Sequence, residues 1–174
     1  MIDGEHLSFA GHEWEVIVGR GHSPEHACLY DEERNILISG DQILPTISPN
    51  VSVWPTEPLA NPLKDWFASL EKLKARMPED VLVLPAHGKP FRGAHRRLDE
   101  LAKEHMDRLD TLLDICTKPL RAVDMFESLY SSRINDSNRI MATGEALAHL
   151  HYLCESGQLH VESNKDGVNY YRRT

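Results

Sequence analysis

Side chains of the metal-ligating type stand beside glycine at three places in this sequence, each next to a short apolar run. The hexapeptide GHSPEH contains His26, one apolar run leads into SGD with Asp41, and another leads into PAHG with His87. A strand fixes the position of the residue that follows it, and glycine lets the backbone turn tightly there. If the three strands end at one edge of a sheet, these three side chains come together.

Two imidazole nitrogens and one carboxylate form a ligand set suited to zinc, and less selectively to manganese or iron. Taken singly, each residue is ordinary, because Asp41 reads as a turn residue, His26 as a strand-edge residue and His87 as a loop histidine. Their shared setting favours a metal site. His22 lies four residues before His26 in the same hexapeptide, and one of these two histidines is expected to be the ligand.

Composition limits the class of protein. The chain has 174 residues, of which 41% are hydrophobic and 26% charged, enough for one good core or two small ones. Its formal net charge of −8 argues against a general affinity for nucleic acid or anionic membranes. It contains no apolar run of membrane-spanning length and no signal-peptide pattern, so we expect neither anchoring nor export. Cys28, Cys116 and Cys154 are an odd number of separated cysteines, which predicts reduced thiols in the cytoplasm.

The first half of the sequence predicts a sheet with helices. Alternating apolar residues predict two strand pairs, and a long loop with four prolines follows the second pair, where it is placed to shape a binding site. A helix opening at Pro62 and ending before Pro78 is followed by a continuous apolar run typical of a strand covered on both faces. The strands are expected at residues 5–9, 13–18, 27–30, 35–39 and 81–84, and the loop at residues 42–60.

The second half predicts helices and then a hairpin. Helices are expected over residues 94–116, 119–130 and 138–156, with Gly157 ending the last one, and strands over residues 159–163 and 168–172. This order is that of a winged helix. His105 falls on an apolar stripe and is expected to be packed or partly exposed, not a ligand. His149 and His151 are two residues apart on a helix, so they point in different directions and are poor candidates to share a metal.

The motifs GHSPEH, SGD and PAHG, in this order, resemble the later metal motifs of the metallo-β-lactamase superfamily. The winged-helix pattern after them is similar to that of the lactamase-β-like 2 subgroup. The resemblance implies that His26 is the third-motif ligand, that Asp41 bridges two metals, and that His87 is the last histidine ligand, whereas His22 matches a position that is usually not a ligand. It implies an α+β fold, the C-terminal half of an αββα sandwich over residues 1–92, a connecting helix over 93–118 and a winged helix over 119–174.

The sequence departs from this family at its first motif. H-x-H-x-D-H should precede the others, but the only H-x-H is formed by His149 and His151, which follow them. We therefore expect half a sandwich, with about two protein ligands per metal where catalytic zinc has three. Such a chain is expected to be inactive alone and to need either an N-terminal half or a second copy, as a homodimer, to cover its sheet.

Two hypotheses on function follow. In the first, the intact protein is a hydrolase with up to two zinc ions, acting on an ester, thioester, lactam or phosphodiester in a small-molecule substrate. In the second, the chain is a non-catalytic oligomerisation or regulatory module. No DNA binding is expected, because residues 119–174 contain six basic and seven acidic residues.

Overall fold

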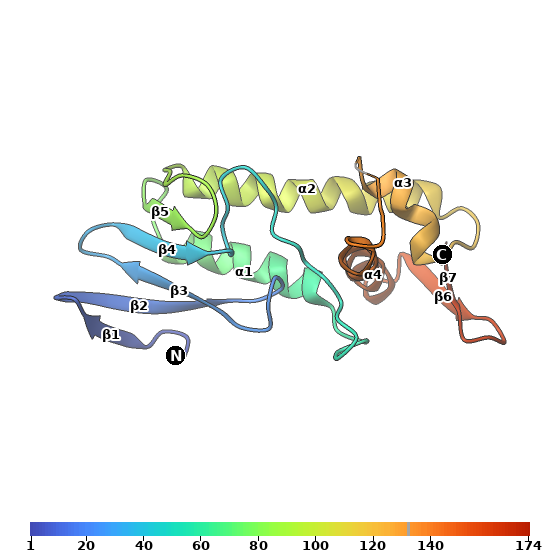
Figure 1. The fold of residues 1–174 in the computed structure, drawn as a ribbon, viewed down its shortest axis with the longest axis horizontal. Coiled ribbons are helices and arrows are strands. Elements are labelled where there is room, and N and C mark those ends of the chain that lie inside the picture. Colours follow the sequence, from blue (N-terminus) through green and yellow to red (C-terminus); the bar gives the residue numbers. More distant parts are fainter. Residues whose placement is uncertain (132) are drawn as a thin grey trace. The chain divides into compact units, whose positions relative to one another are not determined.

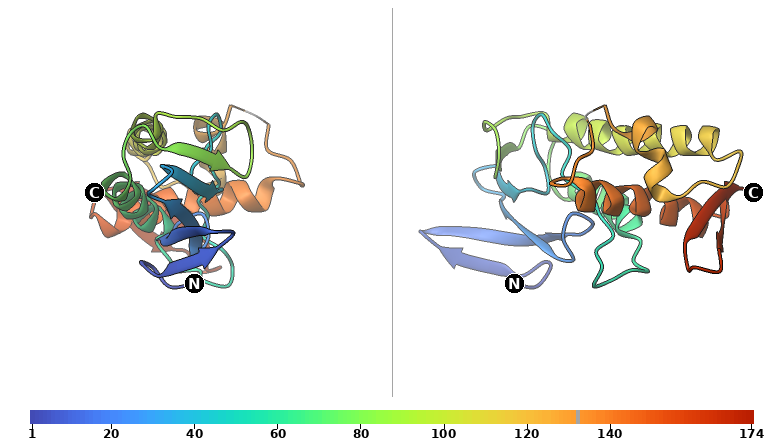
Figure 2. Two further views of the ribbon diagram at one scale, coloured as in Figure 1. Left: turned by 90° about the vertical axis from the view of Figure 1, so that its left-hand side faces the viewer. Right: turned by 45° about the vertical axis from the view of Figure 1, so that its right-hand side comes forward.

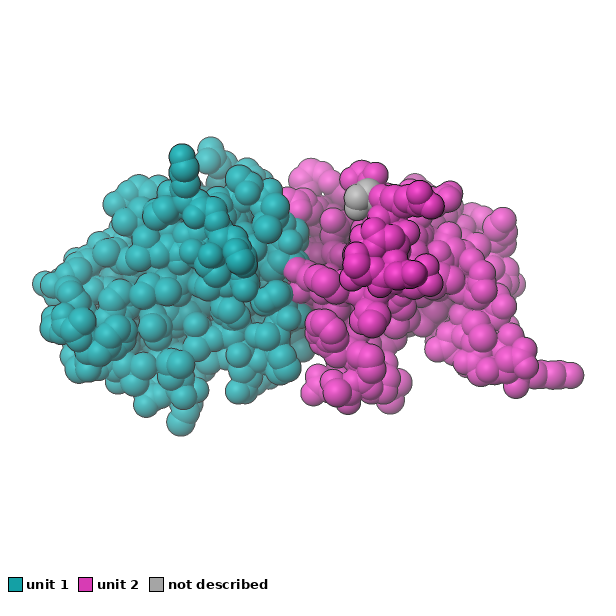
Figure 3. Space-filling view, viewed as in Figure 1, with its two compact units in different colours: residues 1–49, 64–102 teal, residues 50–63, 103–174 magenta. Residues whose placement is uncertain are grey.

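The computed structural model describes residues 1–131 and 133–174, which form two compact units (Figure 3). The first unit contains Met1–Pro49 and Lys64–Ala102, and the second contains Asn50–Leu63 and Lys103–Thr174. Part of the predicted loop thus belongs with the C-terminal residues, and the long helix contributes to both units. The predicted three-part division at residues 92 and 118 therefore stays a prediction. The chain is α+β, as expected from its pattern of strands and helices.

A five-stranded sheet forms the centre of the first unit, in the order β1-β2-β3-β4-β5 (Figure 1). Neighbouring strands are antiparallel from β1 to β4, and β5 lies parallel to β4. Both predicted strand pairs and the later single strand are confirmed. The strands are β1 His6–Phe9, β2 His12–Gly19, β3 His26–Asp31, β4 Ile36–Gly40 and β5 Leu82–Pro85.

The helices of this unit cover one face of the sheet. Helix α1 (Pro62–Arg76) and the first part of α2 (Ala94–Ile115) lie on the same side of the strands (Figure 2). Leu37 and Val83 are paired across β4 and β5 and are fully buried. Their neighbours Ile38 and Leu84 point to the opposite face, because successive side chains of a strand alternate, and they are 36% exposed and half-buried respectively. The prediction that β5 is covered on both faces is therefore wrong for this chain.

The second unit combines the end of α2 with three helical segments and a hairpin. The expected helix at residues 119–130 is reduced to a 3₁₀ turn and a single α turn, whereas the last helix and the hairpin are confirmed. Gly157 follows the last helix with φ of 73°, the left-handed conformation expected of a terminating glycine. Leu120 pairs with Tyr171 and adds a bridge to the hairpin. The elements are η1 Ala122–Met125, α3 Phe126–Leu129, α4 Arg139–Glu155, β6 Leu159–Ser163 and β7 Asn169–Arg173.

Two histidines lie inside the second unit. His105 of α2 and His149 of α4 are almost completely buried, which confirms that His105 is packed. His149 Nδ1 lies 2.7 Å from the carbonyl oxygen of Glu145, so this nitrogen carries the proton. His149 Nε2 then accepts a hydrogen bond from His105 Nδ1 at 3.1 Å. His151 turns away and lies 2.8 Å from the carbonyl oxygen of Ala60 through Nδ1, so the two histidines of α4 have different partners, as expected.

Two further observations concern the predictions from composition. Cys28, Cys116 and Cys154 are all free thiols, and the first two are buried. Burial raises the pKa of the Cys28 thiol to about 12. Within residues 1–131 and 133–174, no helix has the length and apolar character needed to cross a membrane.

Candidate metal site

Strand directions bring the three predicted ligands to one edge of the sheet. Strand β3 begins at His26, and its antiparallel neighbour β4 ends at Gly40, immediately before Asp41. Strand β5 runs parallel to β4 and ends two residues before His87. A hydrogen bond of 2.9 Å from the N–H of Ala86 to the carbonyl oxygen of Gly40 holds the two strand ends together.

Asp41 is the centre of the resulting cluster, because each of its carboxylate oxygens faces a histidine. Oδ1 lies 3.4 Å from Nε2 of His87, and Oδ2 lies 3.8 Å from Nε2 of His22. The N–H of Asp41 donates a hydrogen bond of 3.2 Å to Nε2 of His26. The side chain of Asp41 is 31% exposed and that of His87 is 68% exposed. The structure therefore brings together the three predicted residues and also His22.

Gly40 makes the approach of the His26 ring possible. A Cβ atom on residue 40 would lie 2.3 Å from Nε2 of His26, which is far closer than a real Cβ can come. The φ angle of Gly40 is 53°, in the left-handed region that side chains disfavour. Glycine at position 40 thus allows the chain to turn after β4 and leaves room for the imidazole of His26.

The protonation state of His26 suits a ligand. Because a backbone N–H can only donate, Nε2 of His26 must carry a lone pair and no proton. Burial lowers the pKa of His26, and the neighbouring His22 lowers it further, whereas Asp41 acts in the opposite direction. The ring is therefore neutral at neutral pH, which is the form of histidine that binds metal ions, although in this structure the Nε2 lone pair accepts the N–H of Asp41.

The fit of these residues to a metal ion is partial. Oδ1 of Asp41 is buried and has no hydrogen-bond partner, as expected of an atom available to a cation. Its 3.4 Å separation from Nε2 of His87 matches the edge of a zinc tetrahedron, since bonds of about 2.1 Å place neighbouring ligands about 3.4 Å apart. Among the described residues, however, no three His, Cys, Asp or Glu side chains are arranged to hold an ion together. Asp41 and His87 thus fit as two ligands of one ion, and the full assignment stays a prediction.

Sequence reasoning set one residue of this cluster aside and missed another residue of the same unit. It named His22 with His26 as a candidate ligand and then favoured His26, and the two rings lie 5.9 Å apart, measured between centroids. It also missed Arg97 of α2, which is 7% exposed and donates from Nε to the carbonyl oxygen of Leu44 at 2.7 Å and from Nη2 to that of Ile47 at 3.1 Å. Arg97 therefore anchors the loop that follows Asp41. The sequence feature that could have revealed Arg97 is its position among the apolar residues that form the buried face of this helix.

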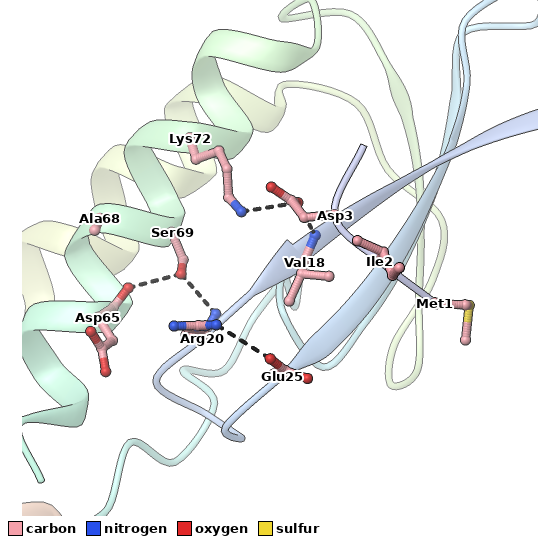
Figure 4. A pocket seen from close by; sticks show the side chains of 10 residues that line it. All are labelled: Met1, Ile2, Asp3, Val18, Arg20, Glu25, Asp65, Ala68, Ser69 and Lys72. Carbon is pink, nitrogen blue, oxygen red and sulfur yellow. Dashed lines mark hydrogen bonds and ion pairs between the residues drawn. The ribbon is translucent and has the colours of Figure 1, made fainter. Parts of the chain in front are cut away.

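A separate polar cavity of about 650 Å³ lies in the first unit beside β2 and α1 (Figure 4). Its polar groups pair with one another. Asp3 accepts hydrogen bonds from the N–H of Val18 at 2.7 Å and from Lys72 at 3.0 Å. The N–H of Arg20 donates to Ser69 at 2.7 Å. These contacts join the N-terminal segment, β2 and α1, which indicates a structural role.

Comparison with known proteins places this arrangement in a family. Residues 1–87 match the model of the metallo-beta-lactamase superfamily, and residues 109–174 match the metallo-beta-lactamase-like C-terminal domain. The chain belongs to the metallo-beta-lactamase superfamily. A beta-lactamase domain protein from Burkholderia ambifaria is 41% identical, with a TM-score of 0.95 over 100% of this chain and 52% of that protein. A metallo-beta-lactamase family protein from Thermus thermophilus is 33% identical, with a TM-score of 0.85 over 100% of this chain and 54% of that protein.

A curated relative agrees with this membership. A probable metallo-hydrolase from Bacillus subtilis is 23% identical over 165 residues, which cover 92% of this chain and 50% of the relative. The chain thus spans about half the length of the relatives it matches. The chain therefore belongs to a family that includes metallo-hydrolases. Membership of this family does not identify the metal ligands or the substrate.

Proposed function

We propose that this chain contributes His26, Asp41 and His87 to the zinc centre of a metal-dependent hydrolase. The observation that supports this most directly is the Asp41 carboxylate, whose buried Oδ1 has no hydrogen-bond partner and lies 3.4 Å from His87 Nε2. His22 faces the second oxygen of the same carboxylate, and Asp41 would be the residue that two ions share. Manganese or iron are the alternative metals for such a nitrogen and oxygen set.

The residues of this chain would hold and orient the centre. His26 supplies a neutral imidazole, Asp41 a carboxylate, and the turn at Gly40 keeps both close. Zinc, when bound, lowers the pKa of a water molecule so that it becomes a nucleophile near neutral pH. The substrate would be a small molecule with an ester, thioester, lactam or phosphodiester bond, and the loop at residues 42–60, anchored by Arg97, would select it.

Activity is proposed for the intact protein and not for this chain alone. The sequence contains no H-x-H-x-D-H motif, and the chain offers about two ligands per ion where catalytic zinc has three. We further propose that residues 119–174 are a winged helix that packs against other protein or covers substrate and does not bind DNA. The three free cysteines support a cytoplasmic location.

Calorimetric titration with zinc tests the ligand assignment. A structural zinc site of four ligands supplies about 10–16 kcal/mol of binding free energy. This chain offers about two ligands per ion, so it should bind zinc weakly, with a dissociation constant in the micromolar range or above. His26→Ala, His87→Ala and Asp41→Asn should each weaken binding at least tenfold. His6→Ala is the matched control, since His6 is an exposed histidine on β1 of the same unit.

Two results would contradict this proposal. Tight stoichiometric zinc binding that none of the three substitutions changes would mean that other residues hold the metal. Metal-dependent turnover of an ester or phosphodiester by this chain alone would mean that the site is complete without a further motif.

A non-catalytic oligomerisation module is the second candidate, and the half-exposed sheet face at Ile38 and Leu84 favours it. If the chain has this role, the histidine substitutions should leave its association state unchanged.

A further inference from the structure

The second unit contains an apolar cavity of about 340 Å³ that the proposed metal centre does not use. It lies between the loop at residues 53–58 and the first turns of α4. The loop contributes Trp54, Pro55 and Pro58, and the helix contributes Ile140 and Leu147. Trp54 is 44% exposed and Ile140 is 68% exposed, so the walls of the cavity present large apolar side chains to water.

Hydrogen bonds and a glycine fix the shape of this cavity. The N–H of Val53 donates to the carbonyl oxygen of Gly144 at 3.0 Å, and Oγ of Ser52 lies 3.2 Å from the carbonyl oxygen of Met141. A Cβ atom on residue 144 would lie 2.8 Å from both Cβ of Ser52 and the carbonyl oxygen of Val53. Gly144 thus lets the loop lie directly against α4. Pro55 and Pro58 restrict the loop further, so the cavity is part of the fold and not a gap between mobile segments.

Positive charge lies at one side of this apolar cavity. Among the described residues that line it, Arg139 is the one with a charge, and it is also the first residue of α4. Its guanidinium pairs with Asp136 at 2.9 Å, but both side chains are well exposed, and such surface pairs contribute little. The N-terminal end of a helix carries partial positive charge as well. An anionic group placed beside Arg139 would therefore be favoured, although the chain as a whole carries a net charge of −8.

The volume indicates the size of the ligand. A cavity of about 150 Å³ lined by apolar side chains holds one benzene molecule. This cavity is about twice as large, so it would take a fused pair of aromatic rings or an acyl chain of about eight carbons. We propose that it binds an apolar monoanion, namely a medium-chain fatty acid or a fused-ring aryl carboxylate, with the carboxylate at Arg139. This inference does not depend on the proposed metal centre.

Binding is measured by titrating the chain with octanoate and, separately, with 2-naphthoate. Tryptophan fluorescence reports on this site, because Trp54 is the exposed one of the three tryptophans, whereas Trp14 and Trp66 are buried. Each acid should change the emission intensity in a saturable way. The acid with the lower dissociation constant shows whether the cavity prefers an acyl chain or a fused aromatic ring. The uncharged analogue 1-octanol should bind about two- to fivefold more weakly than octanoate, as expected for one exposed charge contact.

Three variants test the assignment by calorimetry. Trp54→Ala should weaken octanoate binding roughly tenfold, because it removes the largest apolar wall. Ile140→Ala alters a helix position that is 68% exposed, and it should weaken binding a few-fold. Arg139→Gln should bring octanoate to the affinity of 1-octanol. Leu59→Ala is the matched control, because Leu59 is 92% exposed in the same loop and does not line the cavity.

Three results would overturn the proposal. One is the absence of saturable binding for both acids. Another is binding that is unchanged in Trp54→Ala and Ile140→Ala, or equal for octanoate and 1-octanol. The third is a Trp54 emission that changes with protein concentration in the absence of ligand, because a second copy of the chain would then occupy the cavity.

Discussion

The buried pair of His105 and His149 makes the stability of the second unit sensitive to acid. Burial lowers the pKa of His105 to about 2 and that of His149 to about 4, from an ordinary value of 6.5. Both rings are therefore neutral in the folded protein at pH 5, whereas both are protonated in the unfolded chain. The unfolded state binds more protons, so the free energy of unfolding falls as the pH falls below 6.5.

The size of this effect follows from the two pKa shifts. Each histidine that stays neutral while its unfolded counterpart is protonated lowers the free energy of unfolding by about 1.4 kcal/mol per pH unit. Between pH 7 and pH 5 the pair should therefore lower it by about 4 kcal/mol. That is a large part of the 5–15 kcal/mol typical of a folded domain.

Neighbouring charges act on this pair and must be controlled. Arg108 lowers the pKa of both histidines and lies 2.7 Å from Glu145 through Nη1. Burial raises the pKa of Glu145, so this group takes up a proton more readily in the folded state and opposes the effect of the histidines. Comparing two proteins that both contain Arg108 and Glu145 removes their contribution.

The comparison is between the parent chain and the double variant His105→Leu/His149→Leu. Replacing both partners of a buried hydrogen bond by apolar groups can be nearly neutral, whereas His149→Leu alone would remove the acceptor that Nδ1 of His105 uses, at a cost of about 1–3 kcal/mol. Urea unfolding followed by circular dichroism at pH 7, 6 and 5 gives the free energies. The difference between the two proteins should change by about 4 kcal/mol over this range. A difference that stays constant within about 1 kcal/mol would refute the reasoning, because both rings would then take up protons inside the fold about as readily as in the unfolded chain.

Two further predictions concern association. Because one face of the sheet leaves Ile38 and Leu84 partly exposed, we expect light scattering at micromolar concentration to give a homodimer or aggregation, and Ile38→Glu to favour the monomer; a well-folded parent monomer would contradict it. A mobility-shift assay at low salt should detect no duplex DNA binding, since residues 119–174 contain six basic and seven acidic residues; salt-sensitive binding lost in Arg139→Ala or Lys165→Ala would overturn this prediction.

The sequence was sufficient to predict which residues meet at the edge of the sheet. Each of His26, Asp41 and His87 lies at or just beyond the end of a strand, and alternating or continuous runs of apolar residues located those strands correctly. The strand directions then bring the three side chains to one edge of the sheet, because β3 begins where β4 ends and β5 runs parallel to β4. This inference needs only local patterns and the rule that a strand fixes its ends.

Contacts between distant side chains were not predictable in the same way. His105 and His149 are 44 residues apart, and each alone reads as a histidine on a helix. Arg97 reaches carbonyl groups about 50 residues earlier in the chain. The spacing of apolar residues in the sequence does not predict such pairs, because they depend on which faces of two helices or loops pack together. Tertiary packing supplies this information, and the sequence pattern supplies only the faces that are available.

Gly40 shows that a correct prediction can rest on an incomplete reason. The sequence indicated a glycine that permits a tight turn before Asp41, and the φ of 53° agrees with that interpretation. The structure adds that a side chain here would collide with the His26 ring, whose Nε2 accepts the N–H of Asp41. One residue therefore determines both the direction of the chain after β4 and the distance between the imidazole and the carboxylate. A glycine beside a predicted ligand thus marks a place where side chains must come close, as well as a turn.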